Sequence, residues 1–264
     1  MPDQPPPKTT RRSLLRLAGF GAVVAAAYGG TALLRRLTEP GLQFEPVAGV
    51  PGFRRIAGGP ISGGATAFVG IGSSSDEGST AQTISDGALC GALFDPGDDQ
   101  PRDPAHVQIA YFTDYRCFYC RQVSPMLAQM AQGGGVQVTW HDLPLLGQIS
   151  SVAARAAVAA RAQGAYDAFH ERLMGTPVVP TPPYLRQLSE EVGIDPARLL
   201  RDMTARKTER QLQRTAALAR RFGFIGTPAL VVGRTAVLGG VDRRMVERLV
   251  RAERAMTDPG PCSG

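Results

Sequence analysis

The spacing of hydrophobic and polar residues predicts a strand, a helix and a second strand in the middle of the chain. An apolar run at 107–112 has the length and the β-forming residues of a strand, and 136–140 alternates as another strand. Between the two runs, apolar residues recur at helical spacing over 123–130, and the glycines at 133–135 end the helix. Together the three elements predict a βαβ unit.

The chain from 150 to 222 is helical by composition and predicts an inserted group of helices. Asp195 followed by Pro196 is typical of a helix start, because the carboxylate caps free amides and proline suits the first turn. The expected helices are an Ala-rich run over 150–163, a second ending at Met174, a third after Pro183, a fourth opened by Asp195, and a last run from about Lys207 to Gly223.

Two short apolar runs follow the insert, at 229–232 and 235–238, with the turn residues Gly233 and Arg234 between them. This spacing predicts an antiparallel hairpin. A closing helix at 242–254 would cover one face of the resulting sheet. From residue 105 onward the pattern therefore predicts an α/β fold.

Residues 38–104 are rich in Gly, Pro and Ser and show no strong periodicity. Short apolar pieces such as 67–69 are candidate strands, so we expect a partly ordered extension or linker. Its role stays open among a dimerisation segment, a spacer from a membrane and a flap over a functional site. The expected divisions are an export signal or membrane anchor (1–37), this extension (38–104), two sheet-forming parts (105–149 and 223–256), the helical insert (150–222) and a tail (257–264).

Positive charge is concentrated at the N-terminus. Residues 1–36 hold six basic side chains and one acid, so about +1 of the net charge of +6 is left for the rest of the chain. Nucleic-acid binding would need a basic face on the folded domain. We therefore expect no nucleic-acid partner.

The N-terminal segment resembles a bacterial twin-arginine export signal. It has the pair Arg11 and Arg12, then an apolar run at 17–34 and two more arginines. A basic amphipathic surface helix is the alternative, but the apolar residues surround the whole helix instead of one face. The run has 18 residues, close to the lower limit for crossing a bilayer. Cleavage after Ala32 and a retained membrane anchor both stay open. Either outcome predicts a periplasmic or other extracytoplasmic location, where disulfides persist.

Cys117 and Cys120 form a Cys-x-x-Cys (CxxC) motif where the first predicted strand passes into the helix. The helix dipole and unpaired amides stabilise a thiolate on the first cysteine and lower its pKa. Cys117 would be the exposed attacking thiolate, and Cys120, one turn inward, would resolve a mixed disulfide. Zinc binding and a purely structural pair are the alternatives, but neither Cys90 nor Cys262 has a close Cys or His partner. We expect disulfide chemistry with no metal and no cofactor.

The order of these elements resembles that of the DsbA family of thiol:disulfide oxidoreductases. Two segments resemble that family's strand ends, YFTDYRC at 111–117 and HDLPLLG at 141–147. The resemblance covers about residues 105–255 and implies a thioredoxin-like α/β fold with an inserted helical subdomain. It also implies that Thr227 and Pro228 face the CxxC motif with Pro228 in the cis form, which leaves the Thr227 backbone free to pair with a substrate strand. An ordinary proline at the start of a strand is the alternative.

Phe118 and Tyr119, between the two cysteines, bear on how strongly oxidising the pair is. By the resemblance they join Thr227 and Pro228 in contacting the substrate. DsbA itself has Pro-His there, and Phe118-Tyr119 lacks the cation that stabilises the thiolate, so we expect a milder oxidant. Our first hypothesis is a dithiol oxidase that acts on exported cysteine-containing proteins and is reset by a membrane redox partner. The alternatives are a reductase or isomerase for narrow clients, such as cytochrome or metal-site assembly proteins, and a membrane-tethered chaperone or binding module without turnover.

Three further residues have expected roles. Cys90 and Cys262 are left over, and since such cysteines often pair in an oxidising compartment, we expect a structural disulfide that ties the extension to the C-terminus. A buried thiol at one position and an exposed thiol at Cys262 are the alternative. Asp114, three residues before Cys117, is a candidate proton acceptor for Cys120, and a surface turn residue is the alternative.

Overall fold

The computed structural model describes residues 41–63, 84–95, 102–175, 178–258 and 260–262. The export segment at 1–37 and the candidate strand at 67–69 lie outside these residues. Within the described part, no helix combines the length and the apolar character that crossing a membrane requires. All contacts discussed below lie within the compact unit Phe44–Gly264.

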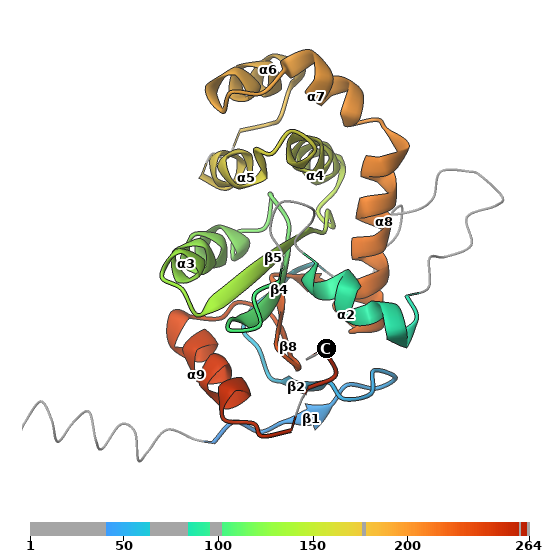
Figure 1. The fold of residues 1–264 in the computed structure, drawn as a ribbon. Coiled ribbons are helices and arrows are strands. Elements are labelled where there is room, and N and C mark those ends of the chain that lie inside the picture. The colour runs from blue at the N-terminus through green and yellow to red at the C-terminus, as the bar shows by residue number, and fades with distance from the viewer. Residues whose placement is uncertain (1–40, 64–83, 96–101, 176–177, 259, 263–264) are drawn as a thin grey trace, which may run out of the picture. The chain divides into compact units, whose positions relative to one another are not determined.

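A six-stranded mixed sheet forms the centre of the fold, in the order β1-β2-β8-β7-β4-β5 (Figure 1). β4 (Val107–Thr113) pairs in parallel with β5 (Val136–Asp142) on one side and antiparallel with β7 (Ala229–Val232) on the other. β7 turns into its antiparallel neighbour β8 (Thr235–Leu238). The predicted βαβ unit and the predicted hairpin are both confirmed.

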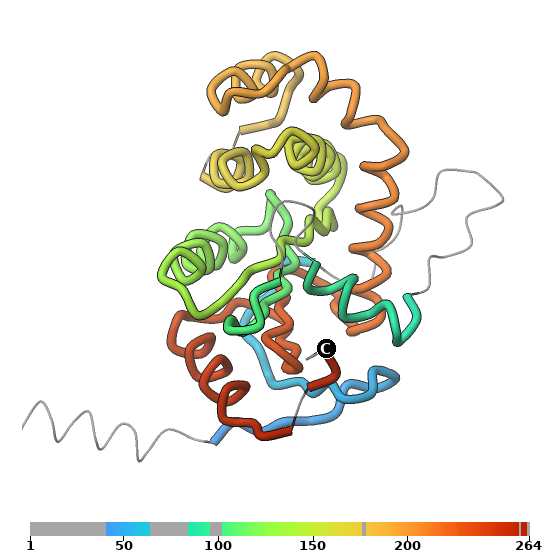
Figure 2. The backbone as a smooth tube through the Cα atoms, viewed as in Figure 1, coloured from blue at the N-terminus to red at the C-terminus, as the bar shows by residue number. Residues whose placement is uncertain are grey.

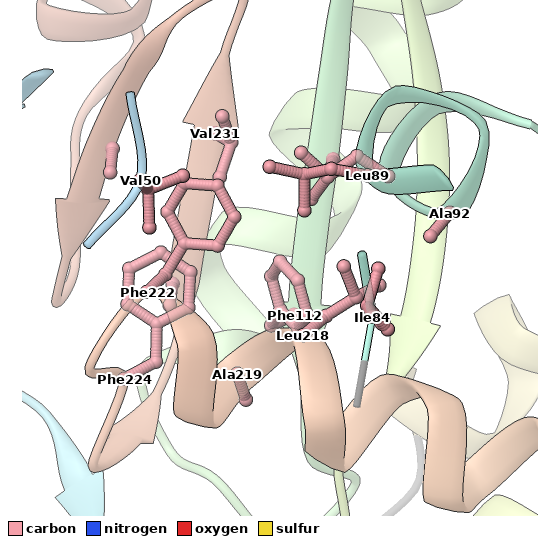
Figure 3. Close-up of a cluster of buried hydrophobic side chains, with 14 of the residues drawn as sticks. Val50, Ile84, Leu89, Ala92, Phe112, Leu218, Ala219, Phe222, Phe224 and Val231 are labelled. Carbon is pink, nitrogen blue, oxygen red and sulfur yellow. The ribbon is translucent and has the colours of Figure 1, made fainter. Parts of the chain in front are cut away.

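Helices cover both faces of this sheet. On one side in Figure 1 lie α3 (Cys120–Gln132) and α9 (Arg243–Arg254), and on the other lie α2 (Asp86–Phe94) and α8 (Arg206–Arg221). Side chains alternate along β4, so Phe112 joins the hydrophobic cluster on the side of α2 and α8. Figure 3 shows Phe112 in this cluster together with Leu89 of α2 and Leu218 of α8.

The helical insert is one continuous segment between β5 and β6 (Gly226–Thr227), coloured from yellow to orange in Figure 2. The expected helices are present as α4 (Gln148–Arg161), α5 (Tyr166–Gly175), α6 (Pro182–Glu191), α7 (Pro196–Asp202) and α8. Asp195 caps α7, as predicted, because its carboxylate accepts from the amides of Ala197 and Arg198 at 2.8 and 3.1 Å. The insert has its own hydrophobic cluster, which includes Cys117 and Cys120.

Part of the segment predicted as a partly ordered extension belongs to the folded domain. β2 (Arg54–Ile56) pairs in parallel with β8, and β1 (Glu45–Pro46) pairs antiparallel with β2. Phe53, just before β2, packs edge-on against Phe222 with 5.2 Å between ring centres. Strands of two and three residues are too short to show alternation, so the hydrophobic pattern alone did not reveal them.

The structure contains a disulfide between Cys90 in α2 and Cys262 near the C-terminus. Cys262 is partly buried against the cluster that contains Phe112. The bridge therefore joins the last described residues to a helix that precedes the first central strand.

Candidate active site

The Cys117–Cys120 pair lies at the junction between β4 and α3. β4 ends at Thr113, and Cys120 is the first residue of α3. The Cys117 amide donates to the Asp114 carbonyl at 3.0 Å, and the Cys120 amide donates to the Cys117 sulfur at 3.2 Å. An amide at the start of the helix thus points at the Cys117 sulfur, where it stabilises negative charge.

The loop before β7 faces this pair. β6 (Gly226–Thr227) precedes Pro228, and the Thr227–Pro228 peptide bond is cis, as the resemblance implied. The Cys117 thiol donates to the Thr227 carbonyl at 3.3 Å. The fold thereby brings Cys117 and Cys120 together with Thr227 and Pro228, which are more than one hundred residues away in the sequence.

Phe118 and Tyr119 differ in their surroundings. Phe118 is 64% exposed, and Ile225, just before β6, is also exposed. Tyr119 is partly buried against the cluster of the insert and meets the Phe118 ring edge-on at 5.5 Å. An exposed aromatic side chain beside a reactive sulfur offers contact area to a partner chain.

Cys117 is wholly buried, at 0% exposure, so the prediction of an exposed thiolate was wrong. The prediction considered only the strand-to-helix junction, whereas distant parts of the chain cover the sulfur. One is the Thr227 carbonyl, and another is Ser62, whose hydroxyl forms a hydrogen bond with the Cys117 sulfur. Ser62 could not be identified from the sequence, because a single serine among glycines carries no signal of its position in space.

The two cysteines differ in proton affinity. Hydrogen bonding with the Cys120 thiol lowers the pKa of Cys117 to about 6 against the opposing effect of burial, and the side chains of Thr227 and Ser62 and the Cys120 amide add to the lowering. Burial, followed by the neighbouring Cys117, raises the pKa of Cys120 well above its ordinary value. At neutral pH the pair therefore holds one thiolate, on Cys117, and one thiol, on Cys120.

Alkylation of Cys117 by iodoacetamide in the reduced protein should accelerate with pH through one midpoint near 6 and then level off. Only the thiolate reacts, and its population falls as the pH drops through that value. The depressed pKa of Cys117 also stabilises the reduced fold. This contribution is full above the unfolded pKa of about 8.5, decreases as the pH falls from there, and is lost once the pH has fallen through about 6. A midpoint of about 8.5 in a stopped-time mass-spectrometric assay would contradict this expectation.

Asp114 is buried, not a surface turn residue, and its carboxylate is engaged by four donors. One oxygen accepts from the Arg116 amide and the Ser150 hydroxyl, both at 2.7 Å. The other accepts from two amides of the loop before α4, at 2.7 and 3.1 Å. Its backbone forms a hydrogen bond with Cys120. Asp114 thus joins the start of the insert to the CxxC loop, and its service as a proton acceptor for Cys120 stays a prediction.

A second buried polar cluster packs beside the cysteines. Asp142 accepts from the hydroxyls of Tyr115 and Tyr166 at 2.8 and 2.9 Å, and the Tyr115 hydroxyl lies 2.9 Å from Nδ1 of His170. Burial, aided by the charge of Arg161, lowers the pKa of His170 to about 3, so the ring is neutral. The cluster joins α5 to the end of β5 and to the loop before Cys117. Among the described residues, no group of three or more His, Cys, Asp or Glu side chains could hold a metal ion.

Known proteins share this arrangement. Residues 108–251, more than half of the chain, match the family model described as the DSBA-like thioredoxin domain. Among curated proteins, the chain is 28% identical over 143 residues to the Na(+)/H(+) antiporter NhaA 3 of Salinispora tropica. That match covers 52% of this chain and 22% of the antiporter, so the chain spans about a fifth of that relative's length.

Three solved structures illustrate the similarity of this chain to proteins with the same fold. A thioredoxin-like oxidoreductase from Silicibacter pomeroyi is 35% identical, with a TM-score of 0.57, over 63% of this chain and 98% of that one. A periplasmic thioredoxin-like protein from Salmonella enterica serovar Typhimurium is 29% identical, with a TM-score of 0.54, over 66% of this chain and 100% of that one. The catalytic domain of Proteus mirabilis ScsC is 25% identical, with a TM-score of 0.56, over the same shares of the two chains.

Proposed function

The chain belongs to the family of DSBA-like thioredoxin domains and is a thiol:disulfide oxidoreductase, and from this premise we propose that it is a dithiol oxidase of exported proteins. Cys117 is the sulfur that exchanges with the client, and Cys120 is the internal partner. The observation that carries the proposal is the pKa of Cys117, lowered to about 6 beside a Cys120 whose pKa is raised.

The reaction proceeds in two exchanges. A client thiolate attacks the Cys117 sulfur of the Cys117–Cys120 disulfide, which forms a mixed disulfide and releases Cys120 as a thiolate that takes up a proton. The client's second thiolate then attacks the client's own sulfur, and Cys117 leaves as the stabilised thiolate. The client loses two electrons and two protons. The enzyme disulfide gains the two electrons, one proton goes to Cys120, and the other goes to solvent because Cys117 stays a thiolate. A low pKa makes Cys117 a good leaving group and stabilises the reduced enzyme, so it favours oxidation of the client.

The reduction potential tests the direction of electron flow. The Cys117 pKa lies between the values of about 7 for thioredoxin and about 3.5 for DsbA. We therefore expect a potential between about −270 mV and about −120 mV, measured by equilibration with glutathione, acid quenching and mass spectrometry. A potential as reducing as that of thioredoxin would overturn the oxidase proposal and favour the reductase or isomerase, which Tyr119 and Thr227 also suit.

We propose that the chain works outside the cytoplasm, where exported proteins acquire disulfides. The basic and apolar N-terminal sequence supports export, and the Cys90–Cys262 disulfide suits an oxidising compartment. A membrane redox partner would then reset the CxxC pair, and residues 17–34 would serve as a signal or an anchor. Cell fractionation with a carbonate wash distinguishes a cytoplasmic, a soluble exported and an anchored protein.

A further inference from the structure

The segment 57–63, which we call the strap, runs from β2 across the active site. β2 ends with Ile56 opposite Val237 of β8, and the strap continues past the end of β8. The Gly240 amide donates to the Pro60 carbonyl at 2.9 Å. The strap then ends in β3 (Ser62–Gly63), which pairs antiparallel with β6. The strap is therefore held by backbone pairing at two places.

Glycines let the strap lie directly on the backbone beneath it. A Cβ atom added at Gly58 would collide with the Leu238 carbonyl oxygen, and one added at Gly59 would collide with the Gly240 carbonyl oxygen. Farther along, a Cβ atom at Gly63 would come within 2.7 Å of the Gly226 Cα atom. Such close approach requires residues without side chains at these positions.

The register of β3 places Ser62 at the reactive sulfur. Ser62 lies opposite Thr227, and the Thr227 carbonyl accepts from the Cys117 thiol. The same Thr227 backbone leads into Pro228, where an extended peptide would add a strand. Because the strap already pairs there and Cys117 has no exposed surface, a client cannot reach the sulfur while the strap is in place.

We propose that the strap is a built-in occupant of the client-binding groove, in which β3 stands in for a client strand and Ser62 for the client's cysteine. This inference rests on the proposed function, because it assumes that the groove receives a cysteine-containing peptide. The client class that fits is an extended segment that pairs antiparallel with β6 and brings its cysteine opposite Thr227. The strap must leave before such a segment binds.

The strap is suited to reversible release. Residues 57–60 are exposed to solvent in the described part of the chain, and the strap carries no charged side chain. A serine oxygen forms no disulfide, so the occupant is held only by non-covalent contacts. A client strand offers equivalent main-chain hydrogen bonds and in addition a sulfur that bonds to Cys117.

The variant Gly59→Ala tests the proposal, because its methyl group cannot fit against the Gly240 carbonyl and must lift the strap. We expect iodoacetamide to alkylate Cys117 at least about tenfold faster in this variant at pH 8, since a closed state leaves only a minor open population to react. Exchange with a synthetic cysteine-containing peptide should accelerate in parallel. The matched control is Gly87→Ala in α2, where an added Cβ atom meets nothing within 4 Å, and it should react as the wild type does.

The outcomes separate the strap from the proposed function. Faster alkylation of Gly59→Ala, with no peptide exchange by either the wild type or the variant, would support the occupied groove. The same result would reject the proposed oxidation of cysteine-containing clients. Unchanged alkylation and unchanged exchange in Gly59→Ala would overturn the strap proposal while leaving the enzyme's chemistry intact.

A cross-link provides a test that does not depend on lifting the strap. In a Cys120→Ala background, Ser62→Cys should form a disulfide with Cys117 when glutathione disulfide is added. The two thiols lose two electrons and two protons, and glutathione disulfide is reduced to two glutathione molecules. The control Ile61→Cys points its thiol to the opposite side of the strap and should stay unlinked to Cys117. Equal cross-linking of both variants, or of neither, in non-reducing peptide mass spectrometry would contradict the register.

Discussion

The substitution Cys117→Ser should reduce disulfide exchange with a client peptide to the rate seen without enzyme, a loss of roughly a thousandfold or more. Serine has nearly the same shape, but its oxygen forms no mixed disulfide, and the hydroxyl is not ionised at neutral pH. The measurement is the rate of peptide oxidation by the preoxidised enzyme, with the folded state of the variant checked by circular dichroism. Activity at the wild-type level would remove Cys117 from the mechanism.

The matched control for this experiment is Cys120→Ala, which keeps the Cys117 sulfur that bonds to the client and removes its internal partner. With the pKa of Cys120 raised and its sulfur buried, its role is internal. Its loss removes the disulfide that the client attacks and also the internal thiol that would release a mixed disulfide from Cys117. A client added as a mixed disulfide with glutathione should therefore accumulate as an adduct on Cys117. No adduct on Cys120→Ala, together with turnover in Cys117→Ser, would reverse the roles of the two cysteines. No adduct and no turnover in either variant would favour a binding module without redox turnover.

Removing the Cys90–Cys262 disulfide should lower the free energy of unfolding by about 2 to 5 kcal/mol. The bridge closes a loop with a sequence separation of 172, so it restricts the unfolded chain strongly. It also holds the C-terminal residues against α2, whose Leu89, Leu93 and Phe94 are buried in the core. Urea unfolding of Cys90→Ser with Cys262→Ser measures the loss.

The exchange rate distinguishes this structural bridge from the reactive pair. At 25 °C the double variant should oxidise client peptide about as fast as the wild type, because neither sulfur lies at the active site. The single variant Cys262→Ser should lose nearly as much stability as the double, since either change opens the bridge. Equal stability of the wild type and the double variant, or losses that simply add, would show that the bridge itself contributes little.

Elements with a clear period were predicted well. The strands near 107–112, 136–140, 229–232 and 235–238 and the helices of the insert all appear, because burial of one face imposes a regular spacing on each of them. α2 was missed, since it contains two glycines and its apolar residues do not form one face. β1, β2 and β3 were missed because strands this short have no period to detect.

The residues of the active site also fall into two groups, those that the sequence revealed and those that only the structure revealed. Cys117 and Cys120 were visible from their spacing, and Thr227 and Pro228 from the resemblance. Asp114 was selected, but the four donors that hold its carboxylate could not be inferred, because three of them come from residues 145–150. The contact between Tyr115, Asp142 and His170 likewise joins three separate elements and leaves no local pattern.

The sequence by itself determined the chemistry of the CxxC pair, its place at a strand-to-helix junction and the order of the principal elements. These follow from local spacing, since neighbours along a strand or helix are neighbours in space. Only the tertiary structure decided between the expected Cys90–Cys262 disulfide and two free thiols, and only it showed that Cys117 is buried and that Ser62 lies opposite Thr227. Each of these depends on contacts between segments far apart in the chain, which form only when the chain has folded and β2 lies beside β8 and β3 beside β6.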